Sequence, residues 1–217
     1  MYYMDEHGAI TFTNGACIND FTLDNPVKLL FNTKLVKLFK LFKGKRVKFS
    51  VGQDVISESM TQTKVRFEVD NMVLTAILFC DDSMVNSVPV NTIRDMCKSD
   101  YTYEININKQ SIMAILNRLM LFVSPSLNLA ASCGKFILDG NNLIISDINE
   151  NIKESIECSV VNSHNDSSYS FVVDITDLKP ALANCVGETI NLKCGNSKSI
   201  VIGYDNIHYI IPEVQIR

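Results

Sequence analysis

The sequence predicts an α+β fold made of two related domains with antiparallel sheets. Strand-like segments alternate apolar and polar residues and are separated by short turns, whereas helical patterns occur singly between them. The chain also repeats itself. TKLVKLFKLFKGKRVKFSVG (33–52) and TDLKPALANCVGETINLKCG (176–195) share Thr, Leu, Gly and alternating apolar residues at the same offsets. A helix followed by a strand is therefore expected twice, once in each domain.

The first copy is expected to run strand, helix, strand, turn, strand. DEHGAITFT (5–13) predicts a turn and an alternating strand. Thr33 is a predicted N-cap and Gly44 a predicted C-cap, and the residues between them have a helical apolar pattern. A strand follows, a loop is expected at 53–63, and KVRFEVDNMVL (64–74) predicts a hairpin.

The second copy has the same order of elements. DGNNLIISD (139–147) parallels the first strand, and Thr176 and Gly187 bracket the helix. SIVIGYDNIHY (199–209) parallels 64–74, and both segments have Asp-Asn at the predicted turn. Each segment is therefore expected to form a strand, a turn and a second strand.

The second copy also has two elements that the first lacks. NKQSIMAILNRLMLF (108–122) predicts an amphipathic helix capped by Asn108, and a strand is expected at 133–138. No counterpart of either precedes the first copy. Residues 1–100 are therefore expected to form an incomplete domain, and residues 101–217 a complete one.

Composition narrows the class of protein. The chain has 217 residues, of which 47% are hydrophobic. No apolar run approaches the roughly 20 residues of a membrane span, and MYYMDEHG lacks the regions of a signal peptide. Seven cysteines without a CxxC pair favour buried thiols in a reducing cytoplasm. The net charge of −4 argues against a general nucleic-acid binder, so DNA binding would need a local basic patch.

One helical segment, 33–44, has lysine on one face only. Its predicted core side is formed by Leu35, Leu38, Phe39 and Phe42. Its other side and the residues after it are basic: Lys34, Lys37, Lys40, Lys43, Lys45 and Arg46. A solvated face is the commoner explanation of such a pattern. A membrane-surface helix is disfavoured because the core needs the apolar side, and DNA phosphates remain a candidate partner.

Three segments give the sequence a resemblance to a known family. ITFTNGACI (10–18) is similar to a strand followed by Thr-Asp-Gly-His-Arg-Leu, FVVDITDLKPAL (171–182) to a strand and inner helix, and HYIIPEVQIR (208–217) to a C-terminal strand. The matching residues are Thr13, Gly15, Ile18 and Pro212, whereas Asn14, Ala16 and Cys17 depart from the motif. In order and spacing, the chain resembles the bacterial DNA sliding clamps of the DNA polymerase III β-clamp family, in a diverged, phage-like form. The resemblance covers the second part of the middle domain and the whole last domain.

The resemblance implies a fold and a function. The fold would be tandem clamp domains, with antiparallel sheets outside and pairs of helices on the inner face. The function would be that of a polymerase processivity factor, as a subunit or C-terminal fragment of a homo-oligomeric ring around duplex DNA. DNA polymerase and clamp loader would bind through short peptide motifs, in the cytoplasm of a bacterial cell. The alternative that stays open is a clamp-fold adaptor that does not encircle DNA.

The resemblance also assigns residues to two surfaces. The expected DNA-facing residues are Lys34, Lys37, Lys40, Lys43, Lys45, Arg46, Lys109, Arg118 and Lys179. The expected residues of a hydrophobic groove for partner peptides are Thr13, Gly15, Cys17, Ile18, Thr176, Ser199, Tyr209, Ile211 and Pro212. Most of the groove residues stand in or next to predicted strands, so packing in the core is the alternative for them.

Catalytic chemistry has little support in the sequence. The three histidines, His7, His164 and His208, are isolated from cysteines and carboxylates at metal-ligand spacing. The glycines form no phosphate-binding loop. We therefore expect no enzyme activity, no catalytic residue, no metal and no cofactor. An enzyme of a type without a local motif is a remote third hypothesis.

Overall fold

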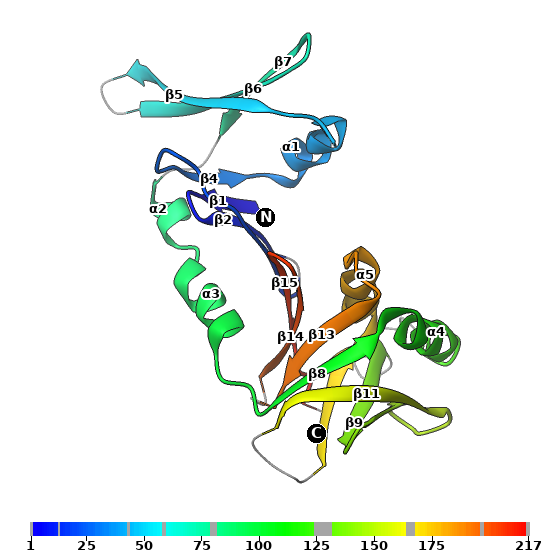
Figure 1. Ribbon diagram of the computed structural model, residues 1–217. Helices are drawn as coiled ribbons and strands as arrows, with labels where there is room; N and C mark the ends of the chain where they lie inside the picture. The colour runs from blue at the N-terminus through cyan, green and yellow to red at the C-terminus, as the bar shows by residue number, and fades with distance from the viewer. Residues whose placement is uncertain are drawn as a thin grey trace. The chain divides into compact units, whose positions relative to one another are not determined.

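The chain forms two compact units in the computed structural model (Figure 1). The structure describes residues 2–12, 14–42, 44–57, 60–78, 82–123, 132–163, 168–195 and 198–215. The smaller unit comprises Met1–Phe12 and Asp20–Val90, and the larger unit comprises Thr13–Asn19 and Asn91–Arg217. The expected division after residue 100 follows the sequence repeat and differs from the boundary of these units.

Two segments upstream of residue 100 belong to the larger unit because of contacts that a sequence repeat does not reveal. Helix α3 (Val90–Lys98) is tied to the following segment by the Tyr101 hydroxyl, which donates a hydrogen bond to the Met96 carbonyl at 2.9 Å. Strand β3 (Ala16–Asp20) pairs antiparallel with β15 (Ile207–Pro212), near the other end of the chain.

The larger unit is built on antiparallel strands in the order β12-β9-β10-β11-β8-β13-β14-β15-β3. Besides β3 and β15, these strands are β8 (Tyr103–Asn108), β9 (Cys133–Asp139), β10 (Asn142–Asp147), β11 (Lys153–Ser163), β12 (Tyr169–Asp174), β13 (Thr189–Cys194) and β14 (Ser199–Tyr204). β11 pairs with β10 through its first half and with β8 through its second half. Alternating burial along these strands confirms the predicted antiparallel α+β fold.

Two helices cover the core of the larger unit and pack against each other: α4 (Lys109–Leu119) and α5 (Ile175–Asn184). Their buried sides include Ile112, Leu116, Leu178 and Leu182, none of them more than 1% exposed. As predicted, Asn108 caps α4, because its side-chain oxygen accepts a hydrogen bond from the Ser111 backbone amide.

The smaller unit contains two groups of strands and short helical segments. Its strands are β1 (Tyr2–Asp5), β2 (Gly8–Phe12) and β4 (Lys28–Phe31) in the order β2-β1-β4, and β5 (Lys48–Ser57), β6 (Met60–Val69) and β7 (Met72–Leu78) in the order β5-β6-β7. Its helices are α1 (Thr33–Leu38), the 3₁₀ turn η1 (Phe39–Phe42) and α2 (Asp82–Asn86). The core around α1 is aromatic, formed by Phe31, Phe39, Phe42, Phe49 and Phe67.

Several local predictions about the turns are confirmed or corrected. Asp70 and Asp205 have φ of 50° and 47°, so both Asp-Asn turns use the left-handed conformation. Gly44 has a φ of 75°, in the left-handed region, but it is not the C-cap of α1: that helix ends at Leu38 with Phe39 as its C-cap, and the 3₁₀ turn η1 follows. Gly187 is not in the left-handed region. α5 instead ends at Asn184, followed by Cys185 in extended backbone.

The helix starts and the predicted loop also differ from expectation. Asn32 and Asp174 are the N-caps of α1 and α5, one or two residues before the predicted Thr33 and Thr176. The segment 53–63 is mostly strand, because β5 and β6 continue as a long hairpin in which Asp54 faces Gln62 across the strands. The polar composition that predicts a loop there does not prevent the backbone from pairing across the hairpin.

Candidate functional site

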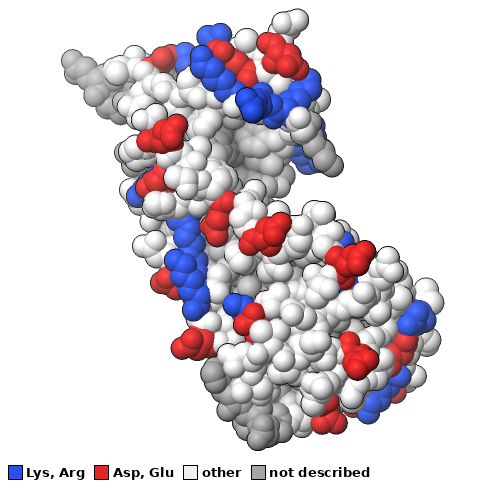
Figure 2. Space-filling view, in the orientation of Figure 1, with Lys and Arg blue, Asp and Glu red and all other residues white. Residues whose placement is uncertain are grey.

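The first candidate surface is the lysine row of α1: Lys34, Lys37 and Lys40. The helix starts at this place because the Asn32 side chain accepts a hydrogen bond from the Leu35 amide at 2.9 Å. All three lysines are exposed and form no ion pair with any described residue. Figure 2 shows lysine and arginine side chains around α1 on the visible face of the smaller unit, with acidic ones among them.

The predicted core side of α1 needs one correction. Leu35 and Phe42 are buried, but Leu38 is 40% exposed and Leu41 is 56% exposed. α1 has only six residues and continues as the 3₁₀ turn η1, so the buried side runs through Leu35, Phe39 and Phe42 instead. The lysine row is thus bordered by two exposed leucines.

The residues after the helix differ from the lysine row. Lys45 is exposed but forms an ion pair with Asp70 at 2.9 Å between Nζ and Oδ2. Arg46 is exposed and has no ion pair with a described residue. Lys43 lies outside the described residues. Their assignment to a DNA surface stays a prediction.

In the larger unit, two of the three predicted basic residues are engaged within the fold. The Lys109 ammonium donates hydrogen bonds to the carbonyls of Ala183 (3.1 Å) and Cys185, at the end of α5, where a positive charge complements the helix dipole. Arg118 forms a two-bond ion pair with Glu154, and the bond from Nε measures 2.7 Å. Lys179 is half-buried on α5 and has no ion pair with a described residue.

The second candidate surface is where β3, β15 and the start of α5 meet. Cys17 and Tyr209 face each other across the β3–β15 pair. The Asn14 side chain donates a hydrogen bond to the Asp177 carboxylate at 3.3 Å, which ties the segment before β3 to the first turn of α5. Gly15 is required here because a Cβ would stand 2.1 Å from the Ile210 carbonyl oxygen.

The predicted groove residues divide into two groups by exposure. Ile18, Ser199 and Ile211 are buried, at 4% exposure or less, and pack in the core. Accessible side chains or backbone come from Gly15, Cys17, Thr176 and Tyr209, all half-buried, and from Pro212, which is exposed. Thr13 lies outside the described residues. The partner-peptide assignment itself stays a prediction.

Burial raises the pKa of three ionisable groups at this surface. Burial, reinforced by the nearby Cys17 thiol, raises the pKa of Tyr209 to about 12. Burial also raises the pKa of Cys17. The carboxyl of Asp177 has a raised pKa because of burial, which its hydrogen bond from Asn14 partly opposes. The Tyr209 phenol and the Cys17 thiol are thus uncharged at neutral pH, which suits an apolar segment of a partner.

Sequence reasoning missed Asn14 and Asp177, the pair that ties this surface together. They stand 163 residues apart, and no local spacing connects them. Their chemistry is also ordinary for a turn and a helix start, so only the fold shows the contact.

Other classes of site receive no support among the described residues. No group of three His, Cys, Asp or Glu side chains could hold a metal ion in the part of the chain that the structure describes. None of the described helices is long and apolar enough to span a membrane. The six described cysteines are free thiols, four of them buried.

The sequence of this chain and its fold give different results when each is compared with known proteins. No protein-family model and no curated protein matches the sequence. Solved structures do match. A protein assigned as a DNA polymerase III β subunit from Eubacterium rectale is 17% identical, with a TM-score of 0.71 over 99% of this chain. The DNA polymerase III β subunit from Borrelia burgdorferi, in complex with a natural product, is 11% identical, with a TM-score of 0.71. The sliding clamp from Pseudomonas aeruginosa, bound to griselimycin, is 9% identical, with a TM-score of 0.72.

The chain has the DNA sliding-clamp fold. The match extends over 99–100% of this chain but only 56–57% of the solved clamps, so the chain spans little more than half their length. At these identities the likeness concerns the clamp fold alone. Both candidate surfaces, the lysine row and the β3–β15 surface, lie on regular elements of this clamp fold.

Proposed function

We propose that the chain is a DNA sliding-clamp subunit, or part of one, and acts as a polymerase processivity factor without catalysing a reaction. The observation that carries the proposal is the clamp fold, which extends over 99% of the chain with a TM-score of 0.71. Such a protein works by topology: a closed ring keeps the polymerase on duplex DNA, so no active site is needed.

The lysine row supports the DNA part of this proposal. Lys34, Lys37 and Lys40 are exposed, and no described acidic side chain pairs with them. Lysine ammonium groups interact with phosphates as point charges and do not distinguish sequences, which is what a sliding protein requires. In the proposed ring, α1 faces the DNA backbone.

The β3–β15 surface supports the partner part. Tyr209, Cys17 and Pro212 offer an accessible apolar surface with little charge. We assign this surface to short hydrophobic motifs of a DNA polymerase and a clamp loader. Two of the similar clamp structures hold a bound compound, a natural product and griselimycin, so clamps of this fold take ligands other than DNA.

A clamp-fold adaptor that does not encircle DNA is the second candidate, and one observation favours it. Lys45, Lys109 and Arg118 are engaged in contacts within the fold, so fewer of the predicted basic residues are free than the sequence suggests. The net charge of −4 points in the same direction.

Primer extension separates the two candidates. The assay combines the full-length protein with its host's clamp loader and polymerase on a primed circular template. It measures the length of the product that the polymerase makes each time it binds. A clamp that tethers the polymerase predicts longer products at unchanged polymerase concentration. An adaptor predicts binding to the polymerase with no change in product length, and that result would rule out the clamp function.

A further inference from the structure

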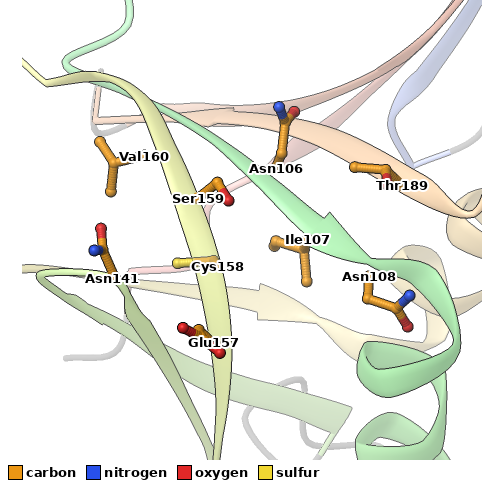
Figure 3. A pocket seen from close by; sticks show the side chains of 9 residues that line it. All are labelled: Asn106, Ile107, Asn108, Asn141, Glu157, Cys158, Ser159, Val160 and Thr189. Carbon is orange, nitrogen blue, oxygen red and sulfur yellow. The ribbon is translucent and has the colours of Figure 1, made fainter.

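The larger unit has a polar pocket of about 460 Å³ that shares no lining residue with either candidate surface. It lies where β11 leaves β10 and joins β8, next to the β9–β10 turn and the starts of α4 and β13. Figure 3 shows the nine side chains that line it: Asn106, Ile107, Asn108, Asn141, Glu157, Cys158, Ser159, Val160 and Thr189. At about 30 Å³ per water molecule, the pocket has room for roughly fifteen waters, so it can admit a whole side chain.

The pocket is held open by the change of partner along β11. Glu157 still pairs with Asn142 of β10, whereas Cys158 pairs with Ile107 of β8. The Cys158 amide donates a hydrogen bond to the Asn141 carbonyl at 2.8 Å, which fixes the β9–β10 turn beside the opening. Buried Ile107 and Cys158 line the pocket from the core side. The cavity is therefore part of the sheet, not of a loop.

The charge of the pocket is negative and unbalanced. Glu157 is the single charged residue in the lining, and it forms no ion pair or side-chain hydrogen bond with any described residue. None of the nine lining residues is a lysine or arginine, which disfavours phosphates and nucleic acids. None is aromatic, which disfavours a stacked base or sugar ring. Burial, and then the charge of Glu157, raises the pKa of the Cys158 thiol, so the thiol adds no second anion at neutral pH.

The remaining polar side chains of the lining are hydroxyls and amides, which can donate as well as accept hydrogen bonds, and the Asn108 oxygen is already occupied by Ser111. Ser159 and Thr189 supply hydroxyl oxygens, and Asn141 supplies an amide oxygen. The Asn106 oxygen already accepts one bond from Asn191 at 3.1 Å and can accept a second. A carboxylate with several neutral oxygens nearby suits a guanidinium group, which is planar and has five N–H donors. An ammonium group has a compact charge and needs only the carboxylate and water.

We propose that this pocket binds the guanidinium group of an arginine carried by a partner polypeptide. The guanidinium makes a paired contact with the Glu157 carboxylate, and its other donors reach the hydroxyl and amide oxygens of the lining. The main chain on either side of the arginine lies at the opening between the β9–β10 turn and the start of β13. This interaction goes beyond the proposed clamp function and requires no DNA.

A titration with model peptides tests the proposal. The probes are acetyl-Ala-Arg-Ala-amide, its lysine counterpart and its citrulline counterpart, which keeps the shape of arginine but has no charge. Each is added to the isotopically labelled full chain while amide NMR signals are followed. The arginine peptide should shift the signals of Asn106, Asn141 and Ser159, and citrulline should weaken binding about tenfold or more.

Two variants complete the test. Glu157→Gln keeps the size of the side chain and should weaken arginine binding to the level of the citrulline peptide. Asp100→Asn, at an exposed carboxylate outside the pocket, should leave binding unchanged. The proposal is overturned if the pocket signals do not move, if citrulline or lysine binds as well as arginine, or if Glu157→Gln has no effect.

Discussion

Basic residues of equal charge have different roles in this molecule, and the neighbouring atoms decide which. Lys109 caps the end of α5 and Arg118 pairs with Glu154, so both hold the fold together. Lys37 and Lys40 have no such partner among the described residues. A helical wheel cannot make this distinction, because the partner of Arg118 is 36 residues away and that of Lys109 is 74 residues away.

Reversing charge in the lysine row should reduce DNA retention without unfolding the protein. In Lys37→Glu/Lys40→Glu, two phosphate contacts are lost, so the salt-dependence slope of DNA binding should fall by roughly 1.8 units. Stability should change by about 0.5 kcal/mol or less, because both side chains are exposed. Retention across a salt series, with thermal melting, measures both effects.

The matched control is Lys28→Glu/Lys98→Glu, which makes the same charge change at two exposed lysines outside the row. The control should keep most of the retention. Equal losses in the two double variants would mean that net charge alone, and not the lysine row, controls binding.

Arg118→Met should act on Glu154 and leave DNA retention unchanged. The hydrogen bond from Arg118 lowers the pKa of Glu154 from its ordinary value of 4.5. A lowered pKa in the folded state means that the pair stabilises the fold above pH 4.5 and that this contribution is lost as pH falls below it. The variant should therefore have a lower melting temperature than the unchanged protein at neutral pH, and the same melting temperature in acid. NMR titration should show a higher pKa for Glu154 in the variant. A clear loss of DNA retention would instead place Arg118 on the DNA surface.

Among the secondary-structure elements, the sequence predicts the type of the strongly periodic segments, but it misses helix α3 and the strand residues within 53–63, and it places element ends less well. The repeat and the 3.6-residue and two-residue periods correctly indicate α1, α4, α5 and both Asp-Asn hairpins, because these signals are local. The N-caps were misplaced by one or two residues, since Asn32 and Asp174 compete with the threonines that follow them. Leu38 could not be placed correctly, because the change from α1 to η1 depends on packing against the strands.

The candidate sites, too, could be predicted only where the sequence has a local signal. The lysine row has a periodic signal and could be found from the sequence. The β3–β15 surface could be outlined only through a family resemblance, because its residues come from three distant segments. The polar pocket of the larger unit has no sequence signal at all, since its lining is spread over β8, β11, the start of β13 and the β9–β10 turn.

Helix α1 of the smaller unit should be less protected than the helix pair of the larger unit. α1 has six residues and is bordered by exposed Leu38 and Leu41, whereas α4 and α5 bury each other. Amide hydrogen exchange of the full chain should therefore show faster exchange in α1 than in α4 and α5. Equal protection in a monomer would contradict the incomplete first domain that the repeat predicts.

At the scale of the whole molecule, the proposed function depends on topology. The clamp fold and the lysine row support the proposal that the protein holds DNA by enclosing it. Binding by enclosure and binding by contact differ in one respect. An enclosing ring leaves DNA through a free end, whereas a contact-bound protein does not need one.

The most direct measurement is retention of the full-length protein on nicked circular DNA before and after the circle is cut. The protein is loaded with its host's clamp loader, separated from free protein by gel filtration at moderate salt, and the DNA is then linearised at a single site. We predict that the protein stays with the circle and is released when the circle is cut. Equal retention on circular and linear DNA, or no retention on the circle, would show that the protein does not hold DNA by enclosing it.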